Sequence, residues 1–369
     1  MISIPNFDCE LNPRDFKTGA NEILANIRHD WDLDRVTFKR CTNGFINHVT
    51  TASMDGGDDK VIIRIFGSQC NESFDRAQQI TATLLLNEMK ISPRVLCIFK
   101  NGFCFEYVEG LVLDWNDFSA LDDIRIAMAY ARELARFHCN LTREYAINKY
   151  KLKERNFVNN HLHTLLGMYP STEQIKEESA RALFEKSAPS KATIAREIEA
   201  LKKMVDDMKL PLVFCHNDSN ATNIIYNKEN DKCTLVDYDM AGFGYAAFDL
   251  ALFLKFICFD LFTAPPSDSP RCQPEYRKGV LLEYLKVKCK LDGEDEGRAM
   301  QLFDRCYAQV RKMYLVVSMI FSIYMIDVTL KEVHMGSPIE FMRKALDVYE
   351  THYLNCKEEL MDLPVPELL

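Results

Sequence analysis

The sequence predicts an α+β protein with two lobes, a small β-rich N-terminal lobe and a large, mainly helical C-terminal lobe. The chain has 369 residues, more than a single hydrophobic core usually serves, so two units are expected. Short strand-like runs bounded by turn residues fill the first hundred positions, whereas apolar residues recur at helical spacing over much of the remainder. We place the boundary between Val108 and Glu109, which gives lobes 1–108 and 109–369.

The N-terminal lobe is predicted to hold two hairpins and one helix. The first hairpin turns at Asp55-Gly56-Gly57-Asp58, a strong turn signal, and the second turns at Lys100-Asn101. The helix is expected to end before Ser92-Pro93, because the residue before a proline is biased away from the helical region. We expect strands at 45–53, 60–66, 95–99 and 102–108, and the helix at 72–89.

The C-terminal lobe is predicted to be built from helices. Apolar residues from Leu121 to Ala135 recur at helical spacing and end near His138, which we interpret as a satisfied core histidine. The most apolar late segment, Tyr314–Ile326, is too short to cross a bilayer and is predicted to be a buried helix. We expect helices at 121–138, at 303–330, at 338–356 and on both sides of 187–190, and a loop at 265–270.

Composition limits the classes of function. The net charge of −9 and the pI near 5.5 argue against a nucleic-acid partner, which requires a basic face. Thirteen cysteines without a C-x-x-C pair indicate reduced thiols, not disulfides or a zinc site. The segment Met1–Glu10 lacks the features of a secretory signal. We therefore expect a cytoplasmic protein without stable membrane insertion, and the oligomeric state stays open between a monomer and a homodimer.

Three polar residues near the middle of the chain have the spacing of a phosphoryl-transfer site. Asp218 lies in a turn after an apolar run, and Asn223 follows five residues later, before another strand-like run. A further apolar run ends at Asp237. In kinases, a loop Asp accepts the proton of the acceptor hydroxyl, and an Asn and a strand-end Asp hold Mg²⁺ against the nucleotide phosphates. A chance H-x-D motif beside an unrelated D-Y-D is the alternative.

These motifs resemble those of the choline/ethanolamine kinase family, which shares the protein-kinase-like fold with aminoglycoside phosphotransferases. The resemblance covers roughly residues 39–353, and the D-Y-x-x-A-G pattern that begins at Asp237 is closer to the ethanolamine branch. It implies transfer of the ATP γ-phosphate to the hydroxyl of an amino alcohol, with ATP and Mg²⁺, as the first step towards phosphatidylethanolamine. The segments that carry the resemblance are 61–67, 101–110, His216-Asn217-Asp218 with Asn223, Asp237-Tyr238 with Ala241-Gly242, and Phe248-Asp249.

The resemblance also assigns nucleotide contacts. The loop with Asn43, Gly44 and Asn47 would close over the phosphates, although one glycine is equally typical of an ordinary turn. Arg64 would bind phosphate oxygens, as a guanidinium does in bidentate fashion, and its alternative is an exposed edge-strand arginine. The backbone of Glu106–Val108 would bind the adenine edge or would simply connect the lobes.

The resemblance gives structural roles to two further polar residues. His216 would support the catalytic loop without transferring protons. Asp249 would order the same loop by accepting hydrogen bonds, or it would cap the following helix. One departure from the family affects Arg64. The family has a glutamate that anchors this arginine, and Gln78 or Gln79 occupies its position here, so we expect a neutral hydrogen bond to Arg64 instead of an ion pair.

The acceptor pocket implied by the resemblance is poorer in aromatic and acidic residues than usual. Met240 and Leu261 replace tyrosines and Phe256 replaces a glutamate, while Phe321 and Tyr324 replace tryptophans. A quaternary ammonium is held largely by cation–π contacts, so these changes should cost choline more binding energy than ethanolamine. A primary ammonium needs hydrogen-bond acceptors, for which Asp239 and Asp260 are the candidates.

The sequence therefore favours an ATP- and Mg²⁺-dependent kinase of ethanolamine, in which Asp218 binds and activates the acceptor hydroxyl. Two alternatives stay open. The first is a kinase of choline or of another small hydroxylated acceptor. The second is a nucleotide-binding pseudokinase that acts as an interaction module, which the glutamine at the helix anchor weakly favours and the retained polar triad disfavours.

Overall fold

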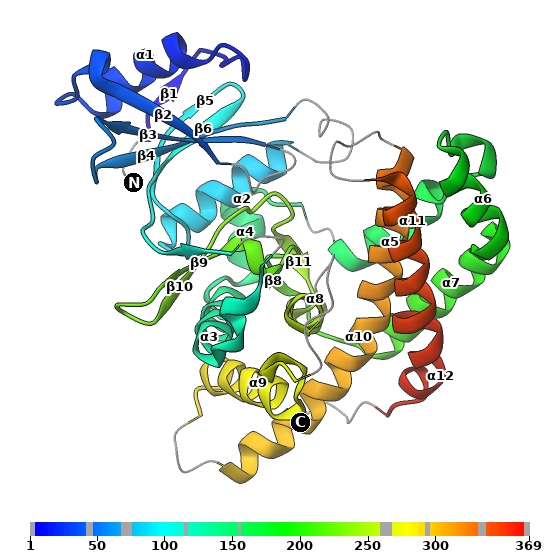
Figure 1. Cartoon of the computed structure of the whole chain (residues 1–369). Helices are drawn as coiled ribbons and strands as arrows, with labels where there is room; N and C mark the ends of the chain where they lie inside the picture. The colour runs from blue at the N-terminus through cyan, green and yellow to red at the C-terminus, as the bar shows by residue number, and fades with distance from the viewer. Residues whose placement is uncertain are drawn as a thin grey trace.

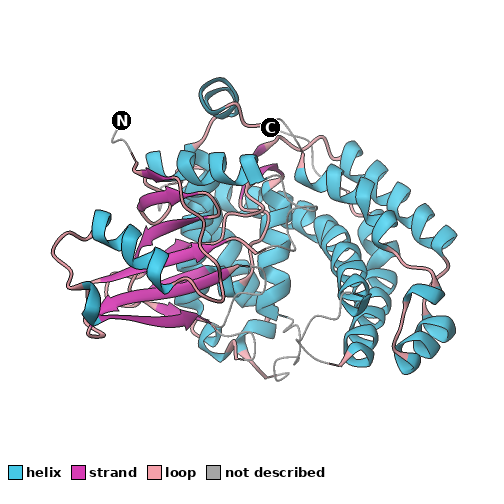
Figure 2. Ribbon diagram, turned by 90° about the horizontal axis from the view of Figure 1, so that it is seen from above, coloured by secondary structure: helices cyan, strands magenta, loops and turns pink. Residues whose placement is uncertain are grey.

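The structure has the two predicted lobes, a small sheet with helices on both sides and a large helical part (Figure 1). Seen from above, the strands of the N-terminal sheet lie side by side at one end of the molecule and helices make up most of the remainder (Figure 2). The predicted α+β fold class is confirmed. This computed structural model describes residues 4–41, 47–67, 76–113, 117–153, 156–258, 268–291, 296–330 and 337–364.

The N-terminal lobe is organised around a six-stranded sheet in the order β1-β5-β6-β4-β3-β2. All neighbouring strands are antiparallel except β1 and β5, and both predicted hairpins, β3-β4 and β5-β6, are present. The strands are β1 (Asn6–Phe7), β2 (Val36–Cys41), β3 (His48–Met54), β4 (Lys60–Ile65), β5 (Val95–Phe99) and β6 (Gly102–Glu106).

Alternate residues of the strands pack against helices on opposite faces of the sheet, as the two-residue period of a strand requires. Val61, Ile63 and Ile65 of β4 share a core with helix α1 (Lys17–Ile27), whereas Ile62 packs with residues that contact helix α2 (Arg76–Glu88) on the other face. The sequence did not predict α1, β1 or β2. The predicted helix 72–89 is α2, and its first positions lie outside the described residues.

The C-terminal lobe is mainly helical, and the predicted helices are found with shifted ends. The break at 187–190 is confirmed, and the Ser190 hydroxyl accepts from the backbone N–H of Thr193, 3.1 Å away, to cap the following helix. The helices are α3 (Ile124–Asn140), α4 (Arg143–Tyr150), α5 (Phe157–Met168), α6 (Glu178–Ser187), α7 (Lys191–Asp207), α8 (Ala246–Cys258), α9 (Pro274–Lys288), α10 (Glu296–Leu330), α11 (Pro338–Asp347) and α12 (Asn355–Met361), with a π-helical turn, Val348–Leu354, between the last two.

Helix α10 is longer than the sequence pattern predicted. It has 35 residues, so the argument that its apolar segment is too short to cross a bilayer was wrong. It is the one helix among the described residues that is long and apolar enough to do so, but 72% of its most apolar window is buried inside the protein. It packs along α8 and α11, so the predicted burial is confirmed.

Two small sheets of the C-terminal lobe hold the predicted polar motif in place. Strand β8 (Val213–Cys215) pairs with β11 (Gly242–Gly244), and the predicted hairpin is formed by β9 (Ile224–Asn227) and β10 (Lys232–Leu235). Strand β7 (Leu111–Val112) pairs with β9, so the chain joins the C-terminal sheets soon after β6 ends. The loops that follow β8 and β10 therefore meet on the side that faces the N-terminal sheet.

We expect Gly102→Ala to destabilise the N-terminal lobe. A Cβ at this position would overlap the Arg64 carbonyl oxygen and the Phe99 ring, and such overpacking costs about 1–3 kcal/mol. Gly167→Ala in α5 is the matched control, because a Cβ there has nothing within 4 Å and alanine stabilises a helix by about 0.5–1 kcal/mol. Urea unfolding of the two variants checks this, and equal stabilities would contradict the described packing of β4 on β6.

Candidate active site

The three residues of the predicted phosphoryl-transfer motif lie next to one another. Asn223 ends a short 3-10 turn, Ala221–Asn223, and its Nδ2 donates to Asp218 Oδ2 at 2.8 Å and to the Asp218 carbonyl at 3.0 Å. Asp237 follows β10 and lies close enough that its charge, after burial, is the second cause of a raised pKa at Asp218. The fold thus brings a half-buried carboxylate, an amide and a second carboxylate into one site.

The backbone of this site adopts conformations that need support from outside. Asn217 and Asp237 have left-handed φ values of 61° and 65°, which non-glycine residues adopt at some cost in energy. Asp249 accepts from the backbone N–H groups of His216 at 2.8 Å and Asn217 at 2.7 Å. His216 Nε2 donates to the Val236 carbonyl at 2.9 Å, so the catalytic loop is tied to the residue before Asp237.

Asp249 makes the hydrogen bonds expected of it, and the helix-cap alternative is wrong. Helix α8 begins at Ala246, so Asp249 lies within its first turn and not before it. The side chain is fully buried. Gly244 is required beside this loop, because a Cβ there would lie 2.5 Å from Asn217 Oδ1.

A histidine and a tyrosine extend this support into the core. His138 Nε2 donates to Asp249 Oδ2 at 3.0 Å, and its Nδ1 accepts from the Tyr284 hydroxyl at 2.8 Å. Burial lowers the pKa of His138 and outweighs the opposite effect of Asp249, so the imidazole is neutral. His138 is a satisfied core histidine, as expected, but it is also the third donor to Asp249. Nothing in the sequence pattern pointed to Tyr284.

Arg64 connects the N-terminal lobe to the side of the site that carries Asp237. Its Nη2 donates to Asp237 Oδ1 at 2.8 Å and to Asp239 Oδ1. Its Nε is buried and has no hydrogen-bond partner in the described part of the chain, which suits a donor that binds an anionic ligand. The alternative of an exposed edge-strand arginine is wrong, because the side chain is 9% exposed.

The predicted anchor of Arg64 by a helix glutamine is wrong. Gln79 donates to Asp239, not to Arg64, and Gln78 Oε1 accepts from the backbone N–H of Lys153 at 3.0 Å. Asp239 also accepts from Asn47 Nδ2 at 2.9 Å. The proposed contact of Asp239 with an acceptor ammonium does not fit this position, since its side chain is 10% exposed and its oxygens bind donors of the N-terminal lobe.

The charges of the site fit a divalent cation. Burial raises the pKa of Asp239 to about 6, and burial with the charge of Asp237 raises that of Asp218. Burial also acts to raise the pKa of Asp237, but Arg64 and other neighbours hold it below its ordinary value. Three carboxylates thus face one guanidinium, an excess of two negative charges when all are ionised. Carboxylate and amide oxygens are the ligands that Mg²⁺ prefers.

Only some of the other residues predicted to contact the nucleotide lie within the described part of the chain. Asn47 lies at the entrance to β3, where its Oδ1 accepts from the Gly67 N–H at 3.4 Å, while Asn43 and Gly44 lie outside the described residues. Glu106 ends β6, and its N–H donates to the Arg94 carbonyl at 2.9 Å, so this N–H is not available to an adenine edge. Val108 follows on the connection between the lobes.

The predicted acceptor residues Phe321 and Tyr324 lie on α10. Phe256 of α8 packs edge-on against Phe321 with ring centroids 5.7 Å apart. The ring of His161 lies 6.4 Å from that of Tyr324 and 3.9 Å from that of Phe157. Helix α5, which carries Phe157 and His161, was not predicted to take part, because its sequence has no motif. Asp260 and Leu261 lie outside the described residues.

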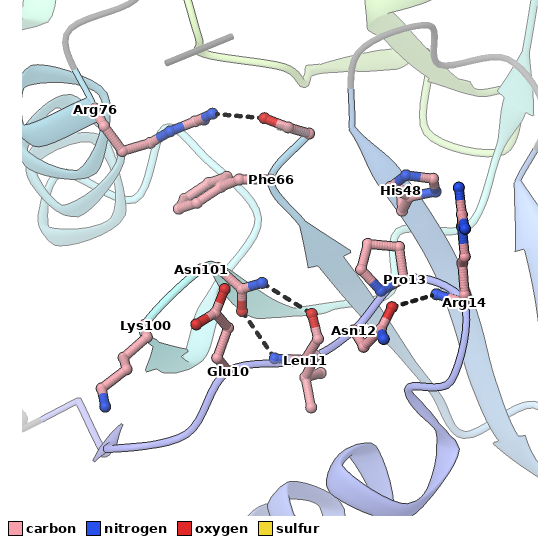
Figure 3. Close-up of a pocket in the computed structure, with 11 residues that line it drawn as sticks. Glu10, Leu11, Asn12, Pro13, Arg14, His48, Phe66, Arg76, Lys100 and Asn101 are labelled. Carbon is pink, nitrogen blue, oxygen red and sulfur yellow. Dashed lines mark hydrogen bonds between the residues drawn. The ribbon is translucent and has the colours of Figure 1, made fainter. Parts of the chain in front are cut away.

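A separate pocket opens at the tip of the N-terminal lobe and has a volume of about 860 Å³ (Figure 3). Arg76 lies on one side with its guanidinium 4.1 Å from the Phe66 ring, and the side chain of Asn101 holds the backbone of Leu11 on the other. None of the predicted site residues lines it. The pocket therefore does not mark the phosphoryl-transfer chemistry.

The sequence matches the choline/ethanolamine kinase family over residues 38–352. This chain is a member of that family. The span agrees closely with the stretch over which the motifs indicated a resemblance. The protein is therefore a small-molecule kinase that uses a nucleotide as phosphate donor.

Individual relatives agree with this membership. A probable ethanolamine kinase of Nematostella vectensis is 25% identical over 367 residues, which cover 98% of this chain and 99% of that protein. An ethanolamine kinase of Plasmodium vivax has a TM-score of 0.71 at 14% identity, covering 95% of this chain and 91% of the other. A choline kinase of Cryptosporidium parvum has a TM-score of 0.69 at 17% identity, covering 94% and 96%. At such identities the structures establish the shared kinase fold and leave the acceptor open.

An internal cation lies beside one of the rings expected to bind the acceptor of this kinase. The Nζ atom of Lys255 is 6.0 Å from the centroid of Phe321 and 4.9 Å from that of Tyr314, and the residue is 5% exposed. Burial lowers the pKa of Lys255 to about 7. A buried lysine with a lowered pKa destabilises the fold at low pH, because its charged form is disfavoured there. This cost is largest below about pH 7 and disappears as the pH rises to the unfolded-state pKa of about 10.4.

We expect Lys255→Met to raise the free energy of unfolding at pH 7, by an amount that shrinks as the pH rises to 10. Between these values the unfolded chain binds a proton that the folded lysine does not, so the wild type gains stability with pH and the variant does not. Lys286→Met, which removes a lysine whose side chain is 60% exposed, is the control and should change stability by less than about 0.5 kcal/mol. Denaturant unfolding at both pH values checks this, and a pH-independent gain would contradict the lowered pKa.

Proposed function

We propose that this kinase transfers the γ-phosphate of ATP to the hydroxyl of ethanolamine, the first step of the route to phosphatidylethanolamine. The observation that carries the proposal is the contact of Asp218 with Asn223 beside Asp237, in a chain of the choline/ethanolamine kinase family. Relatives named ethanolamine kinase that align over nearly the whole chain support this acceptor. The same proposal includes a lobe boundary near Val108. It also includes a cytoplasmic location, which the free thiols at all described cysteines support.

Asp218 orients the acceptor hydroxyl and takes its proton. Its Oδ1 accepts from Asn220 Nδ2 at 3.1 Å and its Oδ2 from Asn223 Nδ2 at 2.8 Å, so both oxygens are held in fixed directions. Phosphoryl transfer passes through a loose transition state, in which positioning of the hydroxyl matters more than the strength of the base. The two amides therefore contribute by orienting the carboxylate.

The phosphates of ATP are bound on the opposite side of the site. The buried Nε of Arg64 and the guanidinium plane behind it suit a phosphate oxygen. Asn223 Oδ1 and the Asp237 carboxylate would hold Mg²⁺, which neutralises charge on the β- and γ-phosphates when bound. Asn223 then has two roles, since its Nδ2 already orients Asp218.

The acceptor side favours a small primary ammonium over a quaternary one. Phe321 is in edge contact with Phe256 and lies near the buried Nζ of Lys255, so less of its π-face is free for a substrate cation. Met240 contributes no ring, and its carbonyl accepts from Asn217 Nδ2 at 3.0 Å. Each lost cation–π contact is worth about 0.5–2 kcal/mol. Ethanolamine can recover part of this through its N–H groups, whereas choline has none.

We expect Asp218→Asn to remain folded and to lose most of its ethanolamine kinase activity. Loss of a positioned base typically reduces turnover by about 10²–10⁴-fold. Asp207→Asn removes a carboxylate of the same kind that is 65% exposed, and it should keep full activity. Coupled ADP-release kinetics and thermal melting of both variants decide the matter. Near-normal turnover by a folded Asp218→Asn protein would remove this site from the mechanism.

We expect ethanolamine to be used with at least about 10-fold higher kcat/KM than choline, a difference that corresponds to about 1.4 kcal/mol. The Phe321→Trp/Tyr324→Trp double variant should narrow the gap, because indole rings bind quaternary ammonium most strongly. Side-by-side kinetics of the two amino alcohols check both statements. Equal or better use of choline by the wild type would overturn the specificity and leave the kinase activity intact.

A further inference from the structure

The amide of Gln79 lies between an arginine and an aspartate that belong to different lobes. Gln79 is on α2 and is 2% exposed. Its Oε1 accepts from Arg76 Nη1 at 2.5 Å, and its Nε2 donates to Asp239 Oδ1 in the loop after β10. One end of the side chain therefore acts as an acceptor and the other as a donor.

A carboxamide is the side chain that meets both demands. An ionised glutamate at position 79 could still accept from Arg76, but its second oxygen would face the Asp239 carboxylate and could only accept. Two facing acceptors with the same charge repel each other in a buried site. Gln78 differs, because its Oε1 accepts from the Lys153 N–H, 3.0 Å away, a role that a glutamate oxygen also fills.

Asp239 in turn holds Arg64 in place. Its Oδ1 accepts from Arg64 Nη2 as well as from Gln79, and its Oδ2 accepts from Asn47 Nδ2 at 2.9 Å. The donors come from β4, from α2 and from the residue before β3, while Asp239 itself lies two residues beyond Asp237. The carboxylate thus fixes the arginine that also touches Asp237 at 2.8 Å.

We propose that Gln79 and Asp239 are a matched pair of positioning residues, in which the acid that anchors Arg64 stands in the loop after β10 and the helix supplies a neutral donor. The glutamine is then not a weakened form of a helix carboxylate. It is the partner that the Asp239 carboxylate requires. The inference deepens the proposed function, since Arg64 is the group assigned to the ATP phosphates.

The test is a double-mutant cycle on ATP binding in the presence of Mg²⁺, measured by titration calorimetry. We expect Gln79→Glu to raise the Kd for ATP at least 10-fold, because it places a second carboxylate against Asp239. Asp239→Asn should also raise the Kd, because Arg64 loses its anchor. The Gln79→Glu/Asp239→Asn double variant again has one acid and one amide in the pair. Its Kd for ATP should therefore be at least 10-fold lower than the value obtained by multiplying the fold-changes of the two single variants.

Gln78→Glu is the matched control, one residue away on the same helix, and its Kd should stay within 2-fold of the wild type because its oxygen keeps the same role. Tight ATP binding by Gln79→Glu, or a double variant whose effect equals the combined single effects, would overturn the proposal. A residue with a merely structural role would give losses in the single variants without rescue in the double variant.

Unfolding free energies of the same four proteins provide a second cycle that needs neither nucleotide nor acceptor. Rescue in this cycle supports the Gln79–Asp239 pairing, and additive losses count against it. If unfolding shows rescue but none of the four proteins binds ATP, the proposed function fails and the pairing stands. If ATP binding follows the expected pattern but ethanolamine is not phosphorylated, only the acceptor assignment fails.

Discussion

The site depends on one buried carboxylate more than on any residue that would touch a substrate. Asp249 is fully buried and receives the backbone N–H groups of His216 and Asn217 together with the imidazole N–H of His138. A buried carboxylate is costly unless its oxygens accept hydrogen bonds, and these three donors supply them. Through the two backbone contacts, Asp249 holds the loop in which Asn217 has a left-handed conformation and from which Asp218 points into the site.

The second constraint is the electrostatic link between the lobes. Arg64 in the N-terminal sheet contacts Asp237 and Asp239 in the C-terminal lobe, so the strand that carries the guanidinium is fixed against the loop that carries the proposed metal ligand Asp237. The Arg64–Asp239 pair is nearly buried, whereas Asp237 is 39% exposed, and breaking one partner of a buried ion pair costs more than losing an exposed pair. The residues proposed to bind phosphate, cation and acceptor hydroxyl thereby lie between two separately packed cores.

Much of this could be predicted from local sequence. Alternating residues and turn signals located both N-terminal hairpins, and helical spacing located most C-terminal helices. Elements stabilised mainly by tertiary contacts were missed. Helix α1 has only 11 residues and is stabilised by packing of Ala20, Ile23 and Leu24 against one face of the sheet, and α10 extends at both ends beyond its most apolar segment.

The sequence by itself determined which chemistry is available. Asp218 and Asn223 are five residues apart in one loop, and the β9-β10 hairpin brings Asn223, just before it, close to Asp237, just after it. It could not determine which side chains pair. Gln79 and Asp239 are 160 positions apart, and His138 and Asp249 are 111 apart. Periods of 2 and 3.6 residues report only on which face of an element a side chain lies. The choice between Gln78 and Gln79, and the transfer of Asp239 from the acceptor pocket to the Arg64 anchor, were decided by how the two lobes pack.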